Sequence, residues 1–520
     1  MKHQIAIDWF GHKDWKPHAF QKQTWKYIAE GYSGMLNAPT GYGKTYAIWF
    51  GILLDFLNRY DLKKPDHKGL HCLWITPLRA LSKEIENATM QVSQDLNLPY
   101  TIGLRTGDTT AKEKAAHKKQ MPHALITTPE SMHLMLAQKD YAAVFMKLQF
   151  VIVDEWHELM GSKRGVQVEL ALSRLRSINP DVKVWGISAT IGNLQEAKDI
   201  LLGTVSEKGV LVKADIEKKT IIETVLPDTL EKFPWAGHLG LKLGSKVVEI
   251  IHKSNSTLVF TNTRFQAETW YRHLLELEPD LAGLLALHHG SLGEETRKWV
   301  EAALHEGKLK AVVCTSSLDL GVDFRPVDTV IQIGSPKGVA RFMQRAGRSG
   351  HQPGATSKIY FVPTHSLEII EGSAMRYAIK NDKVESRIPY IRSFDVLIQY
   401  LVTLAVSDGF IPEQIFKEVK QTHCFNSITW EEFAWCLSFI TTGGKSLYAY
   451  DEFHKVVIEN GVYKVINRRI AMQHRLSMGT IVSGGMLQIK FVTGKYLGTI
   501  EEWFISRLKP GDVFWFAGRK

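Results

Sequence analysis

Eight residues near the amino terminus, APTGYGKT at positions 38–45, constrain the fold of this chain more than any other stretch. An apolar lead with Met35 and Leu36 precedes them, and a helical run over residues 46–57 follows them. Strand, glycine-rich turn and helix are the context that a phosphate-binding loop requires. The glycines let successive amides point at phosphate oxygens, and the helix adds the positive end of its dipole. The pattern departs from GxxxxGK[ST] at its first position, Ala38.

The residues of this loop have separate predicted roles in nucleotide binding. We expect Lys44 to reach the outer phosphates and the Thr45 hydroxyl to hold magnesium. In the segment 10–25, Gln21 can both donate to and accept from an adenine edge, although a solvated glutamine on an amphipathic helix fits the same letters. The predicted ATP contacts here are Gln21, Pro39, Thr40, Gly41, Gly43, Lys44 and Thr45.

A pair of acids forms the second constellation. Asp154 and Glu155 directly follow an apolar run at residues 150–153, which we expect to be a buried central strand. Adjacent acids in such a place are costly unless they serve an ion. We expect Asp154 to hold magnesium through water and Glu155 to orient and polarise the attacking water. His157 is predicted to relay between the nucleotide and neighbouring elements.

Composition narrows the class of protein. The 520 residues, 44% hydrophobic and 23% charged, suit a soluble globular chain of about three or four domains. There is no run of eighteen apolar residues and no signal-peptide core, so we expect no membrane span. The four cysteines have no C-x-x-C spacing, which fits core residues in a reducing cytoplasm. A net charge of +10 suits a polyanion partner, although basic solvated surfaces are common.

Further apolar runs in the first half end in small hydroxyl residues and an arginine. Residues 70–77 and 124–131 show this pattern, and residues 184–190 form another strand that ends in Ser-Ala-Thr. Ligands bind at the carboxyl ends of strands in open parallel sheets, and such groups suit a phosphodiester backbone, although each also fits ordinary loop chemistry. The predicted nucleic-acid contacts here are Thr76, Pro77, Arg79, Thr106, Gly107 and Thr128.

A second α/β set, without a phosphate-binding loop of its own, begins after a domain boundary. Charges, two prolines and glycines mark that boundary over residues 216–244. Strands with polar tips are expected within residues 256–264, 284–292 and 310–324, and a last strand at residues 331–335. The predicted nucleic-acid contacts of this set are Thr261, Asn262, Arg264, His289 and Thr315.

Two arginines follow this second set in the stretch FMQRAGRSGH. Arg345 and Arg348 are three residues apart, so on a helix they share one face. In a glycine-rich setting the pair favours phosphate contact over core packing, and solvated or nucleic-acid-bound side chains are the alternative. Gln344 is counted with them as catalytic, and Gly321 and Asp323 are expected to contact ATP.

The last quarter of the chain predicts a winged helix. Helices are expected within residues 393–410 and at 411–419, a capping box at residues 429–432 opens a third helix, and residues 455–466 form a hairpin around Asn-Gly. Glycine-punctuated strands follow. Basic residues lie nearby, either for binding or as a solvated face: Lys464, Arg468, Arg469 and Arg475.

The stretches APTGYGKT, DEWH, SAT, TSSLDLGVDF and QRAGRSGH together resemble the superfamily-two DExH-box helicases in order and spacing. The set covers about residues 10–355. DEWHEL, the histidine that ends QRAGRSGH and the helical segment after it resemble the Lhr-type group, and in particular the bacterial ligase-associated DEXH-box helicases.

The resemblance implies an α/β fold with two tandem RecA-like domains, a winged-helix domain and the start of a β-rich domain. The expected boundaries are 1–215, 216–385, 386–468 and 469–520. Family members are longer, and the chain ends soon after an apolar run at residues 513–516, so we expect a carboxyl-terminal truncation.

The resemblance also implies an activity: ATP- and Mg²⁺-dependent 3′-to-5′ movement on single-stranded DNA, with unwinding of DNA or RNA–DNA duplexes in DNA repair. By motif, Gln21 takes the Q-motif role, Ser188 and Thr190 couple the domains, and Arg345 and Arg348 are arginine fingers. We expect a monomer in the bacterial cytoplasm, near the nucleoid, with a repair ligase or nuclease as candidate partners. An ATP-gated clamp that does not unwind is the alternative, and a nuclease is disfavoured because no further carboxylate or His/Asp cluster is found.

Overall fold

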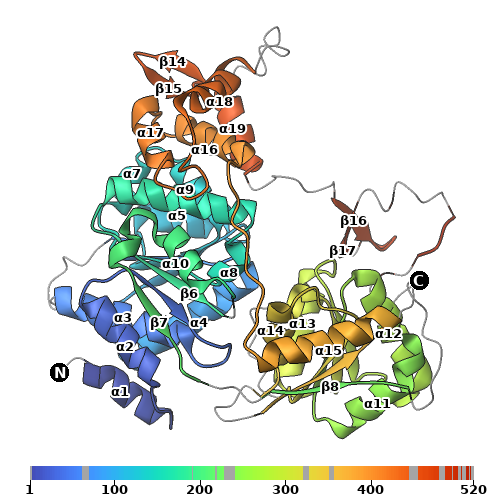
Figure 1. Ribbon diagram of the computed structural model, residues 1–520. Helices are drawn as coiled ribbons and strands as arrows, with labels where there is room; N and C mark the ends of the chain where they lie inside the picture. Colours follow the sequence, from blue (N-terminus) through green and yellow to red (C-terminus); the bar gives the residue numbers. More distant parts are fainter. Residues whose placement is uncertain are drawn as a thin grey trace. The chain divides into compact units, whose positions relative to one another are not determined.

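The structure is a computed structural model (Figure 1). It describes residues 3–60, 69–189, 191–216, 220–227, 240–319, 327–350, 356–443, 455–478, 486–494, 496–501, 505, 511–514 and 516. The chain divides into two compact units, which are described separately. The first unit comprises Met1–Ala38, Gly43–Asp215 and Ser386–Ile481, and the second comprises Pro39–Tyr42, Ile216–Glu385 and Val482–Lys520.

The first unit is built on a parallel sheet whose described strands are short, apolar and mostly buried, as strands covered on both faces must be. The strand order is β3-β4-β2-β5-β6-β1-β7. The strands are β1 (Gly34–Asn37), β2 (Cys72–Ile75), β3 (Ile102–Arg105), β4 (Ala124–Thr127), β5 (Phe150–Val153), β6 (Lys183–Ser188) and β7 (Val210–Lys213). The helices are α1 (His3–His12), α2 (Ala19–Ala29), α3 (Lys44–Arg59), α4 (Arg79–Asp95), α5 (Ala111–Lys119), α6 (Pro129–Leu136), α7 (Tyr141–Phe145), α8 (Trp156–Leu159), α9 (Lys163–Ile178), α10 (Leu194–Leu202) and the 3₁₀ helix η1 (Gly203–Lys208).

The predicted winged helix belongs to this first unit. It contains α16 (Phe394–Val406), α17 (Pro412–Val419), α18 (Trp430–Thr442), β14 (Val457–Glu459), β15 (Val462–Lys464) and α19 (Arg468–Leu476). The capping box is present, because Thr429 accepts a hydrogen bond from the Glu432 amide at the start of α18. The hairpin turns at Asn460 and Gly461, which both have positive φ. The three predicted helices and the predicted hairpin of the winged helix are therefore confirmed.

One apolar core joins the winged helix to the first sheet. Leu73 and Val151 of the sheet, Leu172 of α9 and Leu401 of α16 belong to a single cluster of buried side chains. Figure 1 shows α16 and α17 beside α9. The winged helix therefore packs on the first RecA-like sheet through α9.

The second unit holds the other parallel sheet, with strand order β10-β11-β9-β12-β13-β8. Its strands are β8 (Thr220–Thr224), β9 (Thr257–Phe260), β10 (Leu285–His288), β11 (Ala311–Cys314), β12 (Thr329–Ile333) and β13 (Ser357–Val362), and the antiparallel pair β16 (Met486–Lys490) and β17 (Tyr496–Glu501) also lies in this unit. Its helices are η2 (Leu241–Leu243), α11 (Gly244–Lys253), α12 (Arg264–Leu277), η3 (Pro279–Leu281), α13 (Glu294–His305), η4 (Ser316–Leu318), α14 (Val339–Ala346) and α15 (Ser366–Lys380). The fold class is thus as expected: two RecA-like sheets, a winged helix and small antiparallel strands. No described helix combines the length and apolar character needed to cross a membrane.

Candidate nucleotide and nucleic-acid site

The phosphate-binding loop has the backbone that its glycines predict. Gly41 and Gly43 have φ of 90° and 75°, a region that side chains with a Cβ rarely adopt. A Cβ at Gly43 would also meet Gln21 Nε2 at 2.8 Å. Helix α3 begins at Lys44, whose Nζ donates to the Ala38 carbonyl at 3.1 Å. Lysine, Thr45 and the helix start therefore lie together, as an anion-binding loop requires.

Gln21 is buried on α2 and lies against this loop. Its Oε1 accepts from the His18 amide at 2.8 Å, and its Nε2 donates to the Gly43 carbonyl at 3.1 Å. The amide therefore ties α2 to the phosphate-binding loop. The amide oxygen has a second lone pair and the amide nitrogen a second hydrogen, so the side chain can still accept from and donate to an adenine edge. The adenine contact stays a prediction.

The acid pair lies at the carboxyl end of β5, as expected. Asp154 and Glu155 are 5% and 7% exposed. Asp154 accepts from Trp74 Nε1 at 3.2 Å and from the Glu155 amide at 2.8 Å. Burial and the neighbouring Glu155 charge raise the pKa of Asp154, while the Lys44 charge lowers it. Two buried carboxylates beside a lysine fit a divalent cation, which would remove this penalty.

Glu155 has a strained backbone. Its φ of 46° is left-handed, which is uncommon for a residue other than glycine, and it sits at the N-cap of α8. Such strain occurs where the surroundings fix a functional side chain. The backbone turns here so that Asp154 and Glu155 can both lie at the end of one strand.

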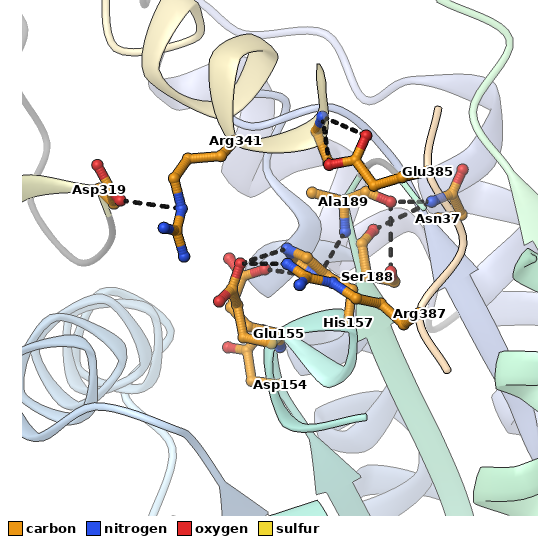
Figure 2. Close-up of polar contacts among 12 residues, drawn as sticks. Asn37, Asp154, Glu155, His157, Ser188, Ala189, Asp319, Arg341, Glu385 and Arg387 are labelled. Carbon is orange, nitrogen blue, oxygen red and sulfur yellow. Dashed lines mark hydrogen bonds and ion pairs between the residues drawn. The ribbon is translucent and has the colours of Figure 1, made fainter. Parts of the chain in front are cut away.

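His157 connects the acid pair to the end of β6 (Figure 2). Its Nδ1 accepts from the Ala189 amide at 3.3 Å and lies 3.4 Å from Glu155 Oε2. Burial lowers the pKa of His157, although Glu155 and Glu158 raise it. The ring is therefore neutral near pH 7, with Nδ1 as acceptor and the proton on Nε2, which lies 3.7 Å from Glu158 Oε1.

Strand β1, which precedes the phosphate-binding loop, also contacts the end of β6. Asn37, the last residue of β1, donates through Nδ2 to the carbonyls of Ser188 and Ala189. The Ser188 hydroxyl donates to the Ala189 carbonyl at 3.2 Å. The predicted coupling residue Ser188 thus lies between the loop strand and His157, and Thr190 lies outside the described residues. Asn37 was not predicted, and only its position at the strand end could have indicated it.

The predicted nucleic-acid contacts of the first unit follow neighbouring strands. Because β2, β4 and β3 are adjacent and parallel, Thr76, Thr106 and Thr128 lie at one edge of the sheet. Arg79 is exposed and pairs with Asp108 at 2.7 Å, close to Gly107. The three threonines are buried, and Thr128 caps α6 by accepting from the Ser131 amide. Pro77 is buried, and its carbonyl accepts from Arg164 at 2.6 Å.

The second unit brings its predicted contacts together in the same way. Thr261, His289 and Thr315 follow β9, β10 and β11, which are adjacent. Asn262 is exposed and donates to the Ser335 carbonyl at 2.7 Å. His289, by contrast, is 1% exposed, and its Nε2 lies 3.2 Å from Glu268 Oε1. Arg264 begins α12, and its guanidinium lies over the Phe516 ring.

Arg345 has surroundings that differ from those predicted. It is 1% exposed, and its guanidinium donates to both Asp319 oxygens, at 2.7 and 3.2 Å, and to Gln332 Oε1 at 2.6 Å. It also lies 4.7 Å over the Phe260 ring. Arg345 is thus packed in the core of the second unit, contrary to the expected preference, and three of its five N–H donors are used there. A catalytic role for this residue stays a prediction.

The expected shared helix face is also corrected. Helix α14 ends at Ala346, so Arg348 lies beyond it, and its amide donates to the Arg345 carbonyl at 2.9 Å. Arg348 and Gln344 are both buried. Gly321 and Asp323 lie outside the described residues.

Asp319 was missed by the sequence analysis. Besides Arg345, it contacts Arg341 Nε at 3.7 Å, one turn earlier on α14 (Figure 2). Two arginines four residues apart on one helix were the available signal for an acidic partner, but nothing in the spacing identifies which acid it is.

Comparisons with known proteins agree with this arrangement. Three family models match: DEAD/DEAH box helicase at residues 18–198, helicase conserved C-terminal domain at 243–352, and large helicase-related protein, winged helix domain, at 377–520. Two RecA-like sheets, one phosphate-binding loop and one acid pair define a superfamily-two helicase. With the matching winged helix, the chain belongs to the Lhr-type helicase family.

The relatives include archaeal and bacterial proteins. The chain is 32% identical to the ATP-dependent helicase Lhr-Core of Sulfolobus acidocaldarius, covering 96% of this chain and 58% of that protein. It is 31% identical to Lhr-Core protein 2 of Thermococcus barophilus, covering 95% and 59%. The structure of Mycobacterium smegmatis helicase Lhr bound to ssDNA and AMP-PNP matches with a TM-score of 0.79 and 28% identity, covering 99% of this chain and 66% of that one. The chain thus spans about three fifths of its archaeal relatives' length, and the ligase-associated subgroup stays a prediction.

Proposed function

We propose that the chain is an ATP-dependent nucleic-acid translocase that moves 3′-to-5′ on single-stranded DNA and unwinds DNA or RNA–DNA duplexes. The observation that supports this most is the buried pair Asp154–Glu155, connected through His157 to the end of β6 and lying within the electrostatic reach of Lys44. Through these contacts, binding or hydrolysis of ATP at the acid pair would shift the residues at the end of β6. The ssDNA and AMP-PNP of the M. smegmatis relative give the ligand classes.

Each residue of the nucleotide site has a definite task in this proposal. Lys44 and the loop amides would bind the phosphates, while Thr45 and Asp154 would hold Mg²⁺. Bound ATP supplies the phosphoryl group that is transferred to water. Glu155 would orient and polarise the water, because its carboxylate is buried at the end of β5 beside Asp154.

Arg348 keeps the arginine-finger role in the proposal, and Arg345 receives another. The guanidinium of Arg345 holds α14 to Asp319 and Gln332, so it positions the residues that follow the helix. Arg348 is the second residue after that helix, following Gly347. An arginine finger is worth on the order of a thousandfold in rate, and a residue that acts through it is worth less.

Nucleic acid would bind at the strand ends of each sheet. Backbone amides and the exposed Arg79 at the first edge, and Asn262 and Arg264 at the second, suit phosphate contact without sequence readout. Thr76, Thr106 and Thr128 are weaker candidates, because their side chains are buried. The net charge of +10 adds a salt-sensitive attraction. His289 is a weaker candidate, because it is buried against Glu268. A repair role, a ligase or nuclease partner, a monomeric state and a cytoplasmic location belong to the same proposal.

Strand displacement tests this function. Duplexes of DNA–DNA and DNA–RNA, each with a 3′ or a 5′ single-stranded tail, are incubated with ATP, and the released strand is measured. We expect release only from 3′-tailed substrates and ATP hydrolysis stimulated by single-stranded DNA. Stimulated hydrolysis without release would indicate the clamp, and hydrolysis unaffected by DNA would refute the translocase.

A further inference from the structure

Residues 385–387 join the second unit to the first, and the boundary between the units falls between Glu385 and Ser386. Linkers between domains are commonly polar segments with few contacts. Here both ends of a three-residue stretch are hydrogen-bonded, Glu385 within the second unit and Arg387 within the first. Three residues span at most about 10 Å when extended, so the stretch has little slack.

Glu385 binds the start of α14. One carboxylate oxygen accepts from the Val339 amide at 3.0 Å, and both oxygens lie 3.1 Å from the Ala340 amide. The N-cap residue, Gly338, has no side chain to do this. The first amides of a helix lack partners within it, and a carboxylate there is also stabilised by the helix dipole. Glu385 therefore caps the helix that precedes Arg348.

Gly338 is shaped to admit this carboxylate. Its φ is 146°, and a Cβ at this position would meet Glu385 Oε1 at 2.2 Å. Alanine at position 338 would therefore displace Glu385 without changing any charge. The close approach gives a second, independent way to break the cap.

Arg387 is held in the first unit by the amide of Asn193. The Arg387 backbone N–H donates to Asn193 Oδ1 at 2.9 Å, and Asn193 Nδ2 donates to the Arg387 carbonyl at 2.9 Å. Asn193 lies in the turn between β6, which ends at Ser188, and α10. The Arg387 side chain adds a longer contact, 3.7 Å, to Glu158 of α8. The two hydrogen bonds of the Asn193 side chain are the stronger anchor, because the ion pair between Arg387 and Glu158 is partly exposed.

We propose that residues 385–387 are a mechanical link between the turn after β6 and the start of α14, and that Glu385 and Asn193 are positioning residues for ATP hydrolysis. Ala189, the residue after β6, contacts His157, and α14 leads to Arg348, so the link connects both parts of the hydrolytic machinery through the covalent stretch 385–387 and the hydrogen bonds at its two ends. This inference rests on the proposed function for the roles of His157 and Arg348. In this inference the link does more than hold the two units together, because it also affects the rate of ATP hydrolysis.

Hydrogen exchange tests the link without any activity. The full chain and its Asn193→Ala variant are compared for amide exchange at Val339 and Ala340. The link predicts that exchange of these amides rises at least about fivefold, the factor that loss of an N-cap commonly contributes, although the substitution lies in the other unit. Gln195→Ala is the matched control, because this neighbouring side-chain amide, in the first turn of α10, bonds only Asp199 among the described residues. Unchanged exchange in Asn193→Ala would overturn the link.

Kinetics tests its role in turnover. Glu385→Gln, Gly338→Ala and Asn193→Ala should each lower the DNA-stimulated kcat about five- to tenfold, with the KM for ATP unchanged. Because the residues act through one segment, the double variant Glu385→Gln/Asn193→Ala should be no slower than either single variant. If the two kcat losses multiplied in the double variant, or if only the KM for ATP changed, the positioning role would be overturned.

The two proposals fail in different ways. A wild-type chain whose ATP hydrolysis ignores DNA refutes the translocase, and the exchange experiment then still decides whether the link exists. A stimulated wild type with unchanged exchange in Asn193→Ala refutes the link alone.

Discussion

Removing Asp319 should destabilise the second unit strongly. Arg345 is 1% exposed and makes two of its three described hydrogen bonds to Asp319. Asp319→Ala leaves this guanidinium charged and buried, with Gln332 as its remaining hydrogen-bond partner among the described residues. Breaking a buried ion pair in this way costs about 3–5 kcal/mol. Urea unfolding followed by circular dichroism measures the change in the unfolding free energy.

A double variant separates this structural role from catalysis. Arg345→Met with Asp319→Leu replaces both charges with apolar side chains, which is often close to neutral for stability. We expect the double variant to recover most of the lost free energy and to hydrolyse ATP within about tenfold of wild type, a difference of at most ~1.4 kcal/mol in barrier. A stable double variant whose kcat has fallen more than a hundredfold would show that Arg345 is itself a finger, and our reasoning would be wrong.

Four further predictions concern the nucleotide site and the winged helix. Lys44→Ala should abolish ATP turnover while circular dichroism shows an intact fold; near-normal hydrolysis would remove the phosphate-loop assignment. Glu155→Gln should bind a fluorescent ATP analogue but hydrolyse ATP poorly, and lost binding would reassign the residue to nucleotide capture. Arg348→Ala should lower the plateau of a DNA-titrated ATPase by at least about a hundredfold, ~2.7 kcal/mol, whereas an unchanged plateau at a higher DNA requirement would mean nucleic-acid contact. Burial raises the pKa of Glu169 to about 8, from an ordinary 4.5, so the stability that its protonated form contributes is complete below pH 4.5 and lost as the pH rises through 8. Urea unfolding from pH 5 to 9 should show this loss in the wild type and not in Glu169→Gln. An equal loss in that variant would contradict the assignment.

Local context made the phosphate-binding loop and the acid pair predictable. The positive φ of Gly43 belongs to the turn itself, so the local glycine pattern indicates it, whereas the approach of Gln21, 22 residues earlier, is a tertiary contact. The acids Asp154 and Glu155 follow an apolar strand whose burial could be inferred from its composition alone. The hairpin of the winged helix was equally local, because Asn460 and Gly461 favour a positive φ.

Long-range partners were not predictable in the same way. The spacing of Arg345 and Arg348 indicates a helix face, but not that α14 ends between them or that Asp319, 26 residues earlier, takes the first guanidinium. The docking of the winged helix depends on pairs still farther apart, such as Glu169 with the Cys424 amide, 255 residues away. No local pattern encodes such a pairing, because each partner taken alone is an ordinary helix or loop residue.

The docking of the winged helix changes which parts of the chain can move as one body. Its core is continuous with that of the first sheet, and Arg174 of α9 pairs with Glu418 of α17 at 2.6 Å, mostly out of solvent. A change at the nucleotide loop that shifts the first sheet must therefore shift the winged helix as well, since separating them would expose that shared core. The chain re-enters this body at Ser386, directly after Glu385. A linker with slack would absorb the shift, whereas a stretch bonded at both ends transmits it to the start of α14, which is why the amides of Val339 and Ala340 are the places to look for it.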